Sequence, residues 1–95
     1  MIQTLGLLRT DYPDTASEKT DEEILAKFRL RIDDTQELNL RQDENLMAYL
    51  IICIRYDTDY QRLMQNSEIN RIICNPGFNE TEKIYLINQI LEKHE

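Results

Sequence analysis

The feature that most constrains this chain is an unbroken run of nine apolar residues, Leu46 to Ile54, with Glu44 before it and Arg55 after it. The run is far shorter than the roughly 20 residues that a helix needs to cross a bilayer, so we expect no membrane span. Its three isoleucines are β-branched and would also suit a buried strand. The choice between helix and strand therefore depends on how the apolar side chains are spaced.

Helical spacing places the apolar side chains of this segment on two adjoining faces. One face carries Leu46, Tyr49, Leu50 and Cys53, and the next carries Met47, Ile51 and Ile54. A helix that is apolar over most of its circumference has to be covered by other elements. The spacing thus predicts a central helix, over about residues 41–56, in an all-α domain.

Other apolar stripes predict the helices that surround the central one. Helical spacing recurs in residues 2–10, 20–37, 66–73 and 79–91, with a polar loop at 11–19 and a short turn at 60–64. We expect the stripes at 24–32, 69–73 and 84–91 to cover the central helix. Two glycines and two prolines are too few for a turn-rich β fold. The 95 residues therefore predict one domain, residues 1–95, a compact bundle of four to five helices.

Capping signals indicate where three of these helices begin. Thr20 and Glu23 have the capping-box spacing, in which each side chain accepts a hydrogen bond from a free backbone N–H of the first turn. Asn79 and Glu82 repeat this spacing before the last helix. Asn66 or Ser67 can cap the short helix that follows it, over residues 66–73.

The charge balance of the chain restricts its partners. Eighteen acidic and eleven basic side chains give a formal net charge of −7, which repels the phosphates of nucleic acids and would steer the chain toward a basic partner. The start of the chain has no basic region followed by a long apolar stretch, so we expect no signal peptide and a cytoplasmic protein. Cys53 and Cys74 both lie in apolar runs without metal-ligand spacing, and we expect them to be reduced core residues.

The titratable residues give little support for catalysis. The sole histidine, His94, is next to last in the chain, where a folded catalytic pair is not expected. The segment that begins at Asp57 matches only the first two ligand positions of a calcium loop, and no glycine-rich phosphate loop is present. We therefore expect no enzyme activity, metal or cofactor. The acidic pairs of the chain are Asp33–Asp34, Asp43–Glu44 and Asp57–Asp59.

Tyrosines beside these acidic residues are candidates for protein contacts. Tyr49, Tyr56 and Tyr60 are spaced by seven and four residues, so they line one side of the central helix and of the turn after it. Tyrosine is enriched among the residues that contribute most to protein–protein affinity. Tyr49 falls within the apolar run and is equally suited to the core. The candidate partner-binding residues are Asp33, Asp34, Tyr56, Asp57, Asp59 and Tyr60.

Three segments carry a resemblance to a known group of proteins: "LLRTDYPDTASEKTDEEIL", "LNLRQDENLMAYLIICIRYDTDY" and "INRIICNPGFNETEKIYLINQI". Their order of helix ends, caps and apolar runs resembles small helical proteins encoded beside effectors in bacterial type VI secretion and polymorphic-toxin loci. These are immunity or accessory proteins. In that pattern Asn39 and Asp57 occupy positions where glycine is expected, and asparagine can adopt the same left-handed conformation.

The resemblance implies a binding protein without catalytic residues. The leading hypothesis is a cytoplasmic immunity protein, whose acidic side chains would occlude the basic active site of a cognate secreted toxin. The alternative is a secretion adaptor that holds an effector for loading, through an apolar groove between helices. A third hypothesis is a homodimer that exposes part of the central helix.

Overall fold

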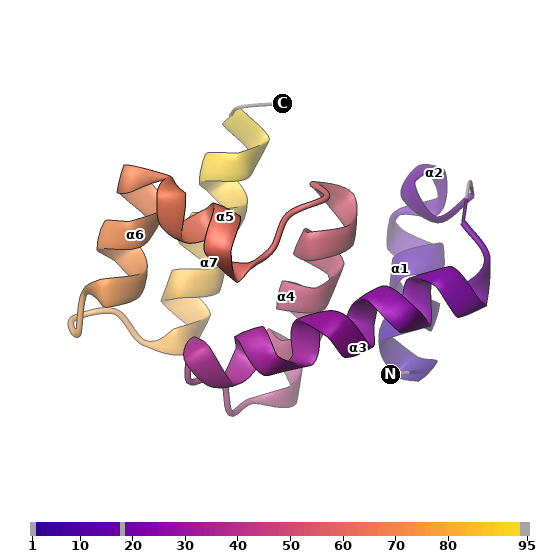
Figure 1. Ribbon diagram of the computed structural model, residues 1–95, viewed down its shortest axis with the longest axis horizontal. Coiled ribbons are helices and arrows are strands. Elements are labelled where there is room, and N and C mark those ends of the chain that lie inside the picture. The colour runs from indigo at the N-terminus through magenta and orange to yellow at the C-terminus, as the bar shows by residue number, and fades with distance from the viewer. Residues whose placement is uncertain (1, 18, 94–95) are drawn as a thin grey trace.

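The computed structural model describes residues 2–17 and 19–93, and within these ranges it contains helices and no strands (Figure 1). The helices are α1 Ile2–Asp11, α2 Pro13–Ala16, α3 Asp21–Glu37, α4 Asp43–Arg55, α5 Tyr60–Gln65, α6 Ser67–Cys74 and α7 Glu80–Lys93. The predicted all-α bundle is therefore confirmed. His94 lies outside the described residues, and the expectation for it stays a prediction.

Two short helices raise the number of helices in the described ranges to seven, above the four to five expected. One is α2, which occupies part of the predicted polar loop. Its first residue is Pro13, whose missing N–H is not needed at the start of a helix. The other is α5, where only a turn was expected. Asp59 caps it, since the Asp59 carboxylate accepts a hydrogen bond from the Arg62 N–H at 2.9 Å.

The three predicted caps are present, at the starts of α3, α6 and α7. Thr20 Oγ1 accepts from the Glu23 N–H at 3.2 Å, but between these two described residues the reciprocal bond of the predicted capping box, from the Thr20 N–H to the Glu23 carboxylate, is not formed. Asn79 and Glu82 form both bonds of a capping box, at 2.8 and 3.4 Å. Asn66 caps α6 by accepting two backbone hydrogen bonds, at 2.9 and 3.2 Å. Local sequence chemistry therefore determines where most helices begin.

Two non-glycine residues have the left-handed backbone conformation among the described residues. Asn39 has a φ of 56° and Asp57 a φ of 47°. They follow α3 and α4 respectively, where the chain has to reverse direction. Both were expected at positions that favour glycine, and asparagine and aspartate tolerate this conformation better than other side chains do.

α4 is the central helix, as predicted, but its cover differs from the prediction. α3, α7 and α1 pack against it, whereas the 69–73 stripe on α6 packs mainly against α5 and α7 (Figure 1). Ile32, the last residue of the α3 stripe, is 38% exposed. The buried apolar core residues on the other described helices are Leu5, Leu8, Ala16, Ile24, Phe28, Leu63, Ile69, Ile84, Ile87 and Ile90.

The two cysteines differ in environment. Cys53 is buried on α4, as expected, and Cys74 is exposed at the end of α6, contrary to expectation. Both thiols are free. Cys74 ends the helix just before the Asn75–Pro76–Gly77 breaker, so no following turn covers it. Within the described ranges, the helices are too short or too polar to cross a bilayer.

Candidate binding groove and acidic surface

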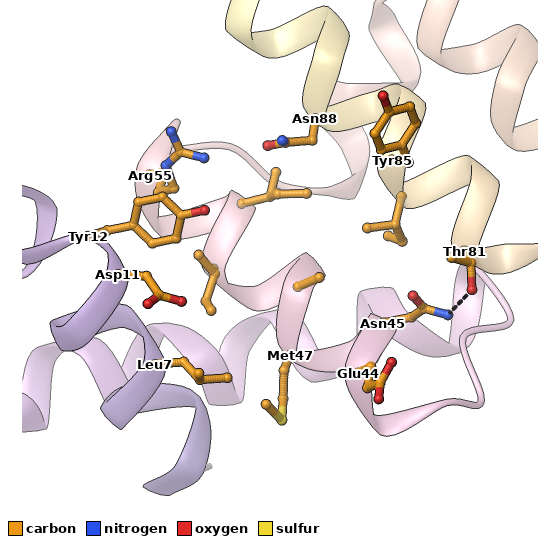
Figure 2. A pocket seen from close by; sticks show the side chains of 14 residues that line it. Leu7, Asp11, Tyr12, Glu44, Asn45, Met47, Arg55, Thr81, Tyr85 and Asn88 are labelled. Carbon is orange, nitrogen blue, oxygen red and sulfur yellow. Dashed lines mark hydrogen bonds between the residues drawn. The ribbon is translucent and has the colours of Figure 1, made fainter.

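An open apolar groove of about 410 Å³ runs along α4 between α1 and α7. Figure 2 shows α4 as its floor, with Leu7 on the α1 side and Tyr85 on the α7 side. These two wall residues are 37% and 61% exposed, respectively. The floor is formed by Met47, Ala48, Ile51 and Ile52. The central helix is therefore accessible along this groove mainly at Met47 and Ala48, because Ile51 and Ile52 are buried.

The end of the groove near the start of α4 is closed by a polar network. Asn45 is buried, and its Nδ2 donates to Glu80 Oε1 at 2.8 Å. The same Nδ2 donates to Thr81 Oγ1 at 3.1 Å (Figure 2). The Glu80 carboxylate also accepts from the backbone N–H groups of Arg41 and Gln42, at 2.9 and 2.8 Å. These bonds favour the ionised form and lower the pKa of Glu80, with the Asn45 bond the largest cause. Glu80 of α7 thereby caps α4.

Aromatic and polar side chains surround the other end of the groove. The Arg55 guanidinium lies over the Tyr12 ring, 4.1 Å from its centroid, which is cation–π geometry (Figure 2). Asn88 lines the same end from α7. Its Nδ2 donates to Glu92 Oε1 at 3.2 Å, while among the described residues its Oδ1 is buried without a hydrogen-bond partner. An acceptor of this kind is favourable for a donor that enters the groove.

The predicted acidic contact residues lie elsewhere, around the junction of α3, α4 and α5. Asp34 Oδ2 accepts from the Tyr49 hydroxyl at 2.8 Å and from the Tyr60 N–H at 3.1 Å. Arg31 lies 3.6 Å from Asp34 and 3.4 Å from Asp59. The carboxylates of Asp34 and Asp59 are thus engaged within the fold, and Tyr49 is a core residue with a bonded hydroxyl.

The other predicted contact residues differ in exposure. Asp33 is exposed, and the side chain of Asp57 is 87% exposed and 3.9 Å from the Lys27 ammonium. Tyr56 and Tyr60 are half-buried and pack against the core. The structure therefore gathers Asp34, Asp59 and Tyr60 in one network and leaves Asp33 and Asp57 at the surface. Whether any of the six contacts a partner stays a prediction.

A smaller cavity of about 180 Å³ lies beside this network and includes Cys53. Burial raises the pKa of the Cys53 thiol to about 12, so the thiol is protonated near neutral pH. Burial also raises the pKa of Tyr49 well above its ordinary value. Neither group is an activated nucleophile. Residues 2–17 and 19–93 contain no group of three His, Cys, Asp or Glu side chains that could hold a metal ion.

Sequence reasoning expected an apolar groove between helices only for the adaptor hypothesis, and it did not locate the groove or name the residues around it. Leu7 and Tyr85 fall outside the stripes that predict the core faces of α1 and α7, and this is the signal that could have found them. Glu80 follows a capping asparagine and has no sequence feature that relates it to α4. A scan against protein-family models, a search of curated proteins and a search of solved structures each give no match.

Proposed function

We propose that this chain is a cytoplasmic immunity protein that binds a cognate secreted toxin and neutralises it by occluding its active site. The open groove along α4 supports a binding role. It leaves Met47 and Ala48 of the central helix only partly covered. Beside it Tyr85, a residue type enriched in interface anchors, is 61% exposed. The net charge of −7 supports a basic partner.

In this proposal the exposed carboxylates and the groove along α4 contribute to binding in different ways. The exposed carboxylates of Asp33 and Asp57 attract the basic partner and raise its association rate, an effect that falls with ionic strength. The groove then supplies the apolar contacts that slow dissociation. The cytoplasmic location comes from the sequence prediction alone.

The groove also favours a second candidate, the secretion adaptor. An apolar groove can hold a segment of an effector without approaching the effector's active site. The two functions therefore differ in which region of the partner is bound and in whether binding abolishes toxicity.

The test begins with affinity capture of the partner, followed by co-expression of its toxin domain with the chain in cells that the toxin kills. Protection is expected from the wild type and from Ala26→Arg, and loss of protection from Ala48→Arg. Ala48 lines the groove, whereas Ala26 is an exposed residue of α3, so the two variants are matched in chemistry. Circular dichroism shows whether each variant folds.

Two results would contradict parts of this proposal. If the wild type binds only the delivery region and does not protect cells, immunity is wrong and the adaptor function is favoured. If Ala48→Arg folds and protects as well as the wild type does, the groove is not the surface that neutralises the toxin.

A further inference from the structure

We infer that the groove along α4 takes one amphipathic helix of the partner, about three turns long, with apolar anchors on one face and basic residues beside them. This inference rests on the proposed protein-binding function and specifies the chemistry of the bound segment. It follows from the shape of the groove, its apolar floor, the charges on its rim and the unpartnered acceptor at one end.

The shape of the groove matches a helix. The residues that line it on α4 extend from Glu44 to Arg55, three turns of the helix. At 1.5 Å per residue this is a length of about 16 Å. α1 and α7 flank α4 on opposite sides and form the walls (Figure 1). A helix laid between them would present residues i, i+4 and i+7 to the floor, as in the helix-in-groove mode of recognition.

The floor and walls suit apolar anchors of variable shape. Ala48 is small and lets a backbone approach closely, and Met47 has a flexible side chain that adapts to different partners. Leu7 and Tyr85, both partly exposed on the walls, would lose water contact when a helix is bound. The free energy of binding would come mainly from this apolar burial.

The rim charges select for a basic helix. Asp11 and Glu44 are exposed and line the groove, Asp11 beside Tyr12 and Glu44 at the Asn45 end (Figure 2). Arg55 is the one basic lining residue in the described ranges, and its guanidinium stacks on Tyr12. A second copy of this chain would bring another net charge of −7 to the same surface, so a basic partner is favoured over self-association.

Asn88 adds a directional preference. Its buried Oδ1 has no hydrogen-bond partner within residues 2–17 and 19–93, and the residue lies at the Arg55 end of the groove. An arginine, lysine, glutamine or tryptophan on the bound helix could donate to this oxygen if the Asn88 amide turns toward the groove, which would replace its hydrogen bond to Glu92. A buried acceptor that gains a donor recovers the desolvation free energy it has lost, so a donor at that end of the helix is favoured.

The experiment uses two designed peptides as probes. Both have leucines at helical i, i+4 and i+7 positions, and the remaining positions are lysine in one peptide and glutamate in the other. Binding to the full chain is followed by calorimetry, and the site is mapped by amide chemical shifts. We expect the lysine peptide to bind at least roughly tenfold more tightly than the glutamate peptide and to shift residues of α1, α4 and α7.

Matched variants assign the effect to the groove. Ala48→Arg is expected to lower the affinity for the lysine peptide at least about tenfold, and Ala26→Arg is expected to leave this affinity nearly unchanged. If Ala48→Arg does not fold, Tyr85→Ala provides the same test, because that exposed side chain contributes little to the fold. Asp11→Lys with Glu44→Lys should reverse the preference between the peptides.

Four results would overturn the inference. If both peptides bind equally well, the rim charges do not select a basic helix. If the lysine peptide changes the amide chemical shifts of other helices only, it does not bind in the groove. A dimer in solution that Ala48→Arg dissociates would show that a second copy fills the groove. If neither peptide binds but the captured partner binds in an Ala48-dependent way, the proposed function stands and the basic helix is wrong.

Discussion

The two long sides of α4 are built differently, although both are apolar in sequence. On the α3 side Tyr49 is fully buried, and its hydroxyl donates to Asp34, which Arg31 approaches in turn. On the groove side Met47 and Ala48 are half-exposed, and the Asn88 oxygen has no hydrogen-bond partner among the described residues. On the first side the polar groups of this network are bonded within the chain. The second is the side to which we propose that a partner binds.

The largest expected difference between the two sides is in the free energy of unfolding after truncation of a tyrosine. Tyr49→Ala creates a cavity in the core and should destabilise the chain by about 3–5 kcal/mol. Tyr85→Ala, the same substitution on the groove wall, should change stability by no more than about 0.5 kcal/mol. Urea denaturation measures both. Similar losses for the two variants would show that the groove is part of the folding core.

A smaller effect is expected when the network on the α3 side is broken. Asp34→Ala leaves the buried Tyr49 hydroxyl without its acceptor and should cost about 1–3 kcal/mol. The adjacent Asp33→Ala serves as the control, because Asp33 is exposed and should have an effect within about 0.5 kcal/mol. Chemical denaturation measures the change in the free energy of unfolding for both variants. If the two aspartates cost the same, the hydrogen bonds to Asp34 contribute nothing net.

The hydrogen bonds at the polar end of the groove should make the chain less stable as the pH falls into the acid range. The pKa of Glu80 is lower in the folded chain than its ordinary value of 4.5. Its contribution is therefore fully present above pH 4.5 and is lost as the pH falls below that value. Thermal melts of the wild type and Glu80→Gln between neutral and acid pH should converge as Glu80 is protonated. A constant difference in Tm at every pH would contradict the linkage.

The smallest perturbation compares the two thiols, of which Cys53 is buried on the α3 side of α4 and Cys74 is exposed at the end of α6. Cys53 is buried and has a pKa of about 12, so a thiol reagent near pH 8 should not modify it in the folded chain. Cys74 is exposed and should react rapidly. A colorimetric thiol assay should therefore detect one thiol per folded chain and two after denaturation. Two fast-reacting thiols in the native state would show that the α3 side opens readily.

Much of the fold could be predicted because its signals are local. The caps at Thr20 and Asn79, the left-handed Asn39 and the apolar run of α4 each depend on residues within one or two turns. The predicted number of helices is lower than the observed number because α2 and α5 are short, and short helices have weak periodicity.

The candidate site could not be predicted in the same way, because it depends on how helices are placed. Asp33 and Asp34 are neighbours in sequence, but successive residues point about 100° apart on a helix, so one faces solvent and the other faces Tyr49. Likewise, α1 packs on α4, whereas α6 packs mainly on α5 and α7. This arrangement decides which face of α4 stays accessible. Apolar periodicity shows that α4 needs cover and does not show which neighbours provide it.

The bonds from Glu80 to the start of α4 have a consequence for folding during synthesis. The carboxylate that satisfies the Gln42 N–H lies 38 residues later in the chain. While the ribosome is still translating α6, the first turn of the central helix lacks its cap, and one wall of the groove does not yet exist. We therefore expect the nascent chain to remain incompletely folded until α7 has emerged, so that no partner can dock in the groove before then.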